Sequence, residues 1–176
     1  MKRLSLAVFA AFALSAGAAS AEVVNRSENG FTLTYERAVT ASDAAILEAL
    51  GDPAAWWSDA HTYSGSAANL SVDLRPGGCW CEALPGGGVK HAETLLVWPA
   101  ERMVSFDAPF GPLRGIGADA VLTVSWDDGG VGGERTLKWK FVVAGPGAGA
   151  MADAVDTVTG EQFGRLADHL SGRAAS

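Results

Sequence analysis

The segment that decides the fold is Arg75-Pro-Gly-Gly-Cys-Trp-Cys-Glu-Ala-Leu-Pro-Gly-Gly-Gly-Val-Lys-His-Ala-Glu93. Two glycine-rich turns, at residues 76–78 and 86–88, bracket one short apolar strand. Similar turn residues return at residues 98–102 and 110–115. Turns at such short intervals between apolar runs predict antiparallel strands joined in a meander.

Periodicity extends this pattern to both ends of the chain. Residues 31–36, 120–126 and 137–143 alternate between apolar and other side chains, which predicts strands with one buried face. Residues 44–50 and a turn opened by Pro53 predict two short helices. From Met151 onward the apolar period lengthens to that of a helix, which we expect to run to about residue 170. The order is one strand, two short helices, six strands and a long helix, an α+β fold.

The same blocks resemble the SRPBCC superfamily (START-like, birch-pollen-allergen-like), and most of all its branch of heat-shock-ATPase-activator homologues. The motifs that carry the resemblance are Trp56-Trp57, Pro76-Gly77-Gly78, Trp80-Cys81-Glu82, Gly86-Gly87-Gly88 and Gly111-Pro112-Leu113. The resemblance covers roughly residues 31–170. It implies a helix-grip fold, in which a curved antiparallel sheet of about seven strands holds the C-terminal helix. Such folds support many unrelated activities, so the resemblance does not fix a function.

The N-terminus predicts export. Lys2-Arg3 is followed by the apolar run 4–14 and by the small residues Ala19-Ser20-Ala21, the three parts of a secretory signal peptide. We expect cleavage after Ala21, so that residues 1–21 are the signal and residues 22–176 form a single domain in the periplasm or outside the cell. An exported protein would not meet the cytosolic chaperone ATPase after which the resembling branch is named.

The net charge of the chain limits the classes of partner that the protein is expected to bind. Cleavage of the signal peptide removes Lys2 and Arg3. Lys+Arg then falls from 13 to 11 against 20 Asp+Glu, and the formal net charge moves from −7 to −9. An acidic chain without a basic cluster argues against nucleic acid and anionic membranes. No segment after the signal approaches the roughly 20 apolar residues of a membrane-spanning helix, so we expect no membrane insertion.

The alternation of inward and outward side chains along the strands predicts a candidate site. If Cys81 lies opposite His91, then Cys79, Cys81, His91 and Glu93 all face inward, and Leu95 and Val97 stay buried. A slip by one residue would instead turn His91 and Glu93 outward together with Trp80 and Glu82. We prefer the first register because it keeps the two apolar residues inside. Cysteines two apart on an extended strand have Cα atoms about 6.5–7 Å apart, so we expect free thiols.

Two functional hypotheses follow. The first is a binding protein for a small, apolar or aromatic molecule held between sheet and helix, with Trp57, Cys81, His91 and Glu93 as ligand-binding residues. The second is a cyclase-like or dehydratase-like enzyme, as in the resembling superfamily, with His91 and Glu93 as an acid/base pair. The ordinary alternative is that these two residues only satisfy each other or the backbone. A zinc site on Cys79, Cys81, His91 and Glu93 and a Cys81–His91 nucleophile are less favoured, and we expect no metal or cofactor.

Overall fold

A computed structural model describes residues 20–130 and 133–173, with side chains from residue 24 onward. Its eight antiparallel strands form one sheet in the order β1-β2-β8-β7-β6-β5-β4-β3. The strands are β1 (Ser20–Ser27), β2 (Gly30–Thr40), β3 (Leu70–Val72), β4 (Cys79–Leu84), β5 (Gly87–Trp98), β6 (Met103–Asp107), β7 (Asp119–Trp126) and β8 (Glu134–Ala144). The helices are α1 (Asp43–Gly51), α2 (Pro112–Gly115) and α3 (Ala152–Leu170), with 3₁₀ turns at Pro53–Ala55, Asp59–His61, Ala67–Asn69, Pro99–Glu101 and Ala148–Met151.

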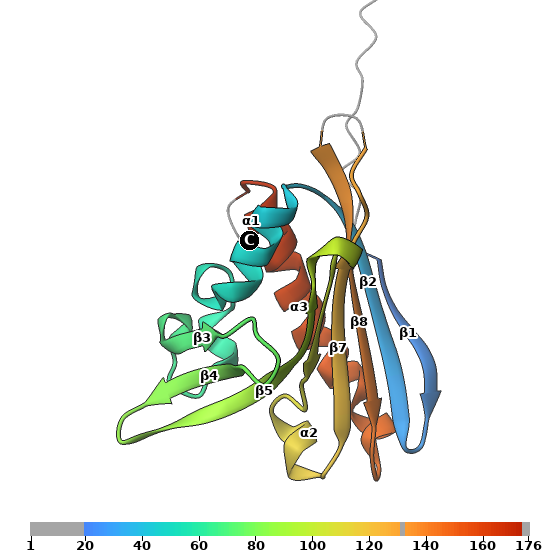
Figure 1. The fold of residues 1–176 in the computed structure, drawn as a ribbon. Helices are drawn as coiled ribbons and strands as arrows, with labels where there is room; N and C mark the ends of the chain where they lie inside the picture. The colour runs from blue at the N-terminus through green and yellow to red at the C-terminus, as the bar shows by residue number, and fades with distance from the viewer. Residues whose placement is uncertain (1–19, 131–132, 174–176) are drawn as a thin grey trace, which may run out of the picture.

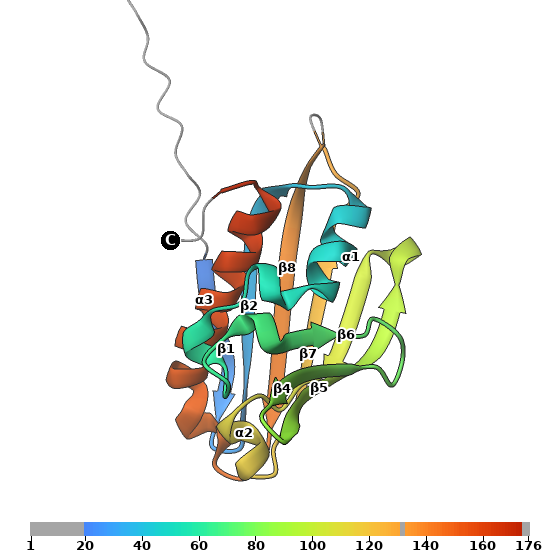
Figure 2. The same ribbon diagram turned by 90° about the vertical axis from the view of Figure 1, so that its left-hand side faces the viewer.

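The helices gather on one face of the curved sheet, and within the described residues no helix covers the opposite face (Figure 1). Seen onto the helical face, α3 lies across the sheet beside β1 and β2, while α1 lies in front of the strands at the other side (Figure 2). This arrangement confirms the α+β fold with a long C-terminal helix against the sheet.

The strand alternation predicted from the sequence is confirmed where the strands are regular. Residues at alternate positions of β2 and β8 are buried, and the two strands pair without interruption from Gly30↔Ala144 to Thr40↔Glu134. The inward residues on these two strands are Phe31, Leu33, Tyr35, Leu137, Trp139, Phe141 and Val143. They form the wall against which α3 packs.

Caps and cross-links hold the helices in place. Ser42 caps α1, since its side chain accepts a hydrogen bond from the Ala45 N–H. Phe163 and Leu166 of α3 are fully buried against the sheet. The Tyr35 hydroxyl on β2 donates to Asp156 Oδ1 of α3 at 2.6 Å. The cap stabilises the start of α1, and the other two contacts tie α3 to the sheet.

The N-terminal region differs from the sequence prediction. The sheet has eight strands rather than about seven, because β1 pairs with β2 from Ser20↔Glu36 onward. Most of the predicted signal peptide, residues 1–19, lies outside the described residues. Within residues 20–130 and 133–173, none of the helices has the length and apolar character needed to cross a bilayer.

The preferred register of β4 and β5 is wrong. Trp80 lies opposite Ala92 and Cys81 lies opposite Lys90, so His91 is an extra residue in a β-bulge. Parity changes at the bulge, and His91 and Ala92 are both buried although they are consecutive. Trp80 and Glu82 face inward, whereas Cys79 and Cys81 face the other side. A second irregularity between Thr94 and Leu96 leaves Leu95 46% exposed, against the expectation that it is buried.

The prediction of free thiols is also wrong. Cys79 and Cys81 are joined in a disulfide, and their Cα atoms are 5.3 Å apart. That separation is shorter than in a fully extended strand and lies within the usual range for a disulfide. The strand is contracted at this point, where its pairing with β5 is interrupted, and the contraction brings the two side chains together.

Candidate functional site

A cavity of about 320 Å³ lies between the sheet and α3. Its aromatic walls are Trp57, Phe110 and Phe141, and Val155 and Val158 of α3 close the opposite side. The volume is at the lower end of the range for small-molecule sites, and the lining is mostly apolar. The position between sheet and C-terminal helix is the one expected for a ligand in the sequence analysis.

Trp57 is held in place by its neighbours rather than left free at the mouth. Its indole Nε1 donates to the carbonyl oxygen of His61 at 3.0 Å. Its ring packs against Trp80 with a centroid distance of 5.2 Å and against Phe110 at 5.9 Å. A ring fixed on several sides offers a flat apolar surface to the cavity at little cost in conformational entropy.

Glu82 and His91 form a buried polar pair beside these aromatic rings. Glu82 on β4 is 1% exposed and His91 on β5 is 9% exposed. Glu82 Oε2 lies 2.8 Å from His91 Nε2, and the same oxygen accepts from the Tyr63 N–H at 3.1 Å. The Ser64 N–H donates to the other carboxylate oxygen. The β-bulge is what brings His91 onto the inner face, within reach of Glu82.

The charge of Glu82 is stabilised in this position. Burial opposes its ionisation, but hydrogen bonds from Ser64, Tyr63 and His91 outweigh burial and lower the pKa of Glu82 to about 2. Glu82 is therefore a carboxylate at neutral pH, and a carboxylate can only accept hydrogen bonds. His91 Nε2 must carry the proton of this contact, which leaves Nδ1 as the second polar atom of the imidazole.

Other polar groups lie around the same cavity. Tyr63 is 63% exposed, and its ring stacks on that of His91 with centroids 5.7 Å apart. On the α3 side, His61 Nε2 lies 3.0 Å from Glu161 Oε2. Tyr63, His61 and His91 all line the cavity, so polar side chains stand beside its aromatic walls. The site combines mostly apolar walls with a few polar side chains.

The structure brings together only part of the predicted site. Trp57 and His91 line the cavity, but Cys81 and Glu93 do not. Cys81 lies in the disulfide on the outer side, and Glu93 forms an ion pair with Lys90 there. In this protein Glu82 is the carboxylate that contacts His91, and Glu93 is not.

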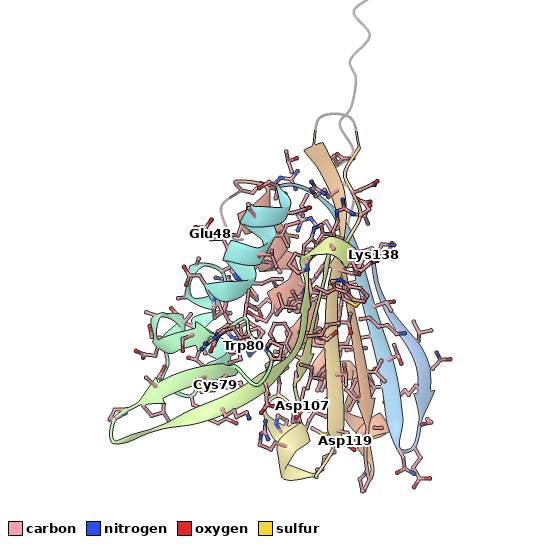
Figure 3. All side chains as sticks on the ribbon, viewed as in Figure 1. Glu48, Cys79, Trp80, Asp107, Asp119 and Lys138 are labelled. Atoms are coloured by element: carbon pink, nitrogen blue, oxygen red, sulfur yellow. A yellow bond between two sulfur atoms is a disulfide. The ribbon has the colours of Figure 1, made fainter. Side chains whose placement is uncertain are left out.

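Glu82 was missed because the two cysteines were assigned to the inner face. Trp80 could have corrected this, since a tryptophan buries far more apolar surface than a cysteine and shares a strand face with Glu82. Figure 3 shows Trp80 directed into the space enclosed by the sheet and the helices. Phe141 lay on a predicted strand face and Val155 and Val158 on the predicted helix, whereas Phe110 fell in a predicted turn. No local motif distinguishes a cavity wall from ordinary core.

The described residues do not support a metal centre. Within residues 20–130 and 133–173, no three His, Cys, Asp or Glu side chains gather closely enough to hold an ion. The zinc set considered from the sequence is divided between the two faces of the sheet, with its cysteines in a disulfide.

Comparison with known proteins supports the fold alone. No protein-family model matches the chain, and no curated protein matches its sequence. Among solved structures, CalU16 from Micromonospora echinospora is similar at 15% identity and a TM-score of 0.54, covering 90% of this chain and 87% of its own. A Rhodobacter sphaeroides protein is similar at 17% identity and a TM-score of 0.54, covering 87% and 96%. A Rhizobium leguminosarum protein reaches 21% identity and a TM-score of 0.50, covering 89% and 100%. The chain shares a helix-grip-like sheet fold with these proteins.

Proposed function

We propose that the protein binds a small apolar or aromatic molecule in the cavity between the sheet and α3. The observation that carries this proposal is the cavity itself, whose aromatic wall contains Trp57 and whose single buried imidazole, His91, is oriented by Glu82. A few fixed polar groups in an apolar pocket are the usual form of a small-molecule site. The bound molecule would place its apolar part against Trp57 and a hydrogen-bonding group at His91.

We further propose that the protein is an exported member of the SRPBCC superfamily, nearest its heat-shock-ATPase-activator-homologue branch. The motifs quoted above and the shared helix-grip-like fold support membership. Export is supported by the anatomy of residues 1–21 and by the Cys79–Cys81 disulfide, since disulfides persist in oxidising compartments. Sequencing the N-terminus of the protein recovered outside the cytoplasm tests this. Glu22 is the expected first residue, and an intact Met1 would contradict export.

Native mass spectrometry of protein purified from its own host tests the binding function. We expect a mass excess that corresponds to one small organic molecule. His91→Ala should reduce the retained fraction, whereas Lys138→Ala on the open face of the sheet should not. Figure 3 shows Lys138 on that open face, away from the helices. A wild-type protein without any excess mass, or equal retention by the two variants, would contradict the proposal.

A second candidate function is acid/base catalysis in the same cavity. It is favoured by one observation, the contact between Glu82 and His91, in which a carboxylate orients an imidazole that faces the cavity. In this arrangement His91 Nδ1 would take a proton from the substrate and return it, while Glu82 stabilises the imidazolium. A catalytic role requires that activity on a candidate substrate is lost in His91→Gln, and that binding without turnover is retained.

A further inference from the structure

The Cys79–Cys81 disulfide lies on the side of β4 that faces away from the cavity. The residues on either side of Cys81 in the chain, Trp80 and Glu82, are each 1% exposed, whereas both cysteines are partly exposed. In the part of the chain that the structure describes, no helix covers this face of the sheet (Figure 1). A thiol dissolved in water can therefore approach the disulfide without opening the core, which is the first requirement for exchange.

This disulfide contributes little as a cross-link. It joins residues two apart in the sequence, so it restricts the unfolded chain far less than a bridge across a long loop. Both cysteines also belong to one strand, which is already paired with β3 and β5 on its two sides. The stability of the fold does not explain why two cysteines occupy these positions.

The two sulfur atoms have different electrostatic surroundings. Across the β4–β5 pair, Cys81 lies opposite Lys90 and Cys79 lies opposite Glu93. A nearby ammonium group favours a thiolate, and a nearby carboxylate disfavours one. Lys90 and Glu93 also form an ion pair with each other, so the two sulfur atoms differ in which end of this pair comes from the residue opposite them: the ammonium end for Cys81 and the carboxylate end for Cys79. On this basis we assign Cys81 as the leaving thiolate.

We propose that Cys79 and Cys81 form a redox-active pair that undergoes thiol–disulfide exchange with small external thiols. The external thiolate attacks Cys79 Sγ and forms a mixed disulfide with it, and the bond between the two cysteines breaks as Cys81 Sγ leaves with the electron pair. A second external thiolate then attacks the external sulfur of the mixed disulfide, which releases Cys79 as a thiolate and the external disulfide as product. The protein disulfide is reduced by two electrons, two external thiols are oxidised, and the reverse sequence restores the starting state.

The fluorescence of Trp80 should report whether the cysteine pair is oxidised or reduced. Trp80 is the residue enclosed by the disulfide ring, and its indole packs against Trp57 and Phe106 with centroids 5.2 Å and 5.4 Å away. Reduction removes the bond that holds the cysteine Cα atoms 5.3 Å apart, so that β4 can extend towards about 6.5–7 Å at this point. The surroundings of Trp80 change, and its fluorescence should change with them.

Equilibration of the folded protein in glutathione buffers of different reduced-to-oxidised ratio tests the proposal. Alkylation after acid quenching, followed by intact-mass measurement, counts the free thiols, and circular dichroism follows the fold. We expect the thiols to appear in pairs without denaturant, the tryptophan fluorescence to change in parallel, and oxidised glutathione to reverse both. Lys90→Gln should slow reduction several-fold, whereas Lys138→Gln, which removes the same charge from the open face elsewhere, should not.

Three results would overturn the proposal. One is a disulfide that resists excess reduced glutathione until the chain is denatured. Another is loss of the folded circular-dichroism signal upon reduction. The third is aerobically purified protein in which both cysteines are already free thiols. Equal rates for the Lys90 and Lys138 variants would overturn the assignment of Cys81 as the leaving thiolate.

Discussion

The Glu82 carboxylate on β4 lies 2.8 Å from the imidazole Nε2 of His91 on β5, and both side chains are buried beside an apolar cavity. Glu82 also accepts the backbone N–H groups of Tyr63 and Ser64, which fixes its position and its charge. The orientation of His91 follows from that of Glu82. Within the residues that the structure describes, no hydrogen bond is made by His91 Nδ1, so this atom is the one that a bound molecule could contact.

The tautomer of His91 is the first testable consequence. Because ionised Glu82 can only accept a hydrogen bond, Nε2 of His91 must be protonated at neutral pH. Long-range nitrogen–proton NMR spectra should show a protonated Nε2 in the wild-type protein. A spectrum with an unprotonated Nε2 would contradict the contact with a carboxylate.

Glu82→Gln should destabilise the protein. The variant keeps one acceptor oxygen but loses the charge that receives three hydrogen bonds, so we expect the free energy of unfolding to fall by about 2–3 kcal/mol at pH 7. Urea unfolding followed by tryptophan fluorescence measures this. Glu93→Gln, on the outer side in an ion pair with Lys90, is the matched control and should stay within about 0.5 kcal/mol of wild type. Equal losses of unfolding free energy in the two variants would contradict a larger stabilising contribution from the buried Glu82 carboxylate.

Acid should remove the contribution of Glu82. The pKa of Glu82 is lowered from 4.5 to about 2 in the folded protein, so protonation favours the unfolded chain. Its stabilisation is fully present above about pH 4.5 and is lost as the pH falls from there to about 2, a change of roughly 3 kcal/mol at 1.36 kcal/mol per unit.

Comparison with Glu82→Gln isolates this effect. The pKa values of Asp73, Asp127 and Glu161 are also lowered, so both proteins should lose stability in acid. The difference in the free energy of unfolding between the wild-type protein and Glu82→Gln should shrink between pH 4.5 and 2. A stability difference that stays constant over this pH range would contradict the lowered pKa of Glu82.

Regular elements could be predicted from the sequence, and the site could be predicted only in part. The alternation at Leu137, Trp139, Phe141 and Val143 survives in the structure because β8 pairs without a bulge on either side. The prediction of inward and outward side chains from simple alternation was wrong on β5, because a bulge adds one residue and exchanges the two faces beyond it. His91 was still placed inward, but the cysteines and Glu93 were placed on the wrong side of the sheet.

Filling the cavity tests the central claim most directly. Val158 of α3 lines the cavity, and Val158→Phe should occupy part of its 320 Å³ without adding a charge. Val121→Phe makes the same change on the open face of β7, where the side chain is 39% exposed. The measurement is a fluorescence titration with the apolar dye anilinonaphthalene sulfonate, with circular dichroism to confirm that each variant is folded. We predict saturable binding by wild type and Val121→Phe, and affinity weakened roughly tenfold or more, about 1.4 kcal/mol, in Val158→Phe. Equal affinity in the two variants, or no saturable binding by the wild-type protein, would contradict a ligand site between the sheet and α3.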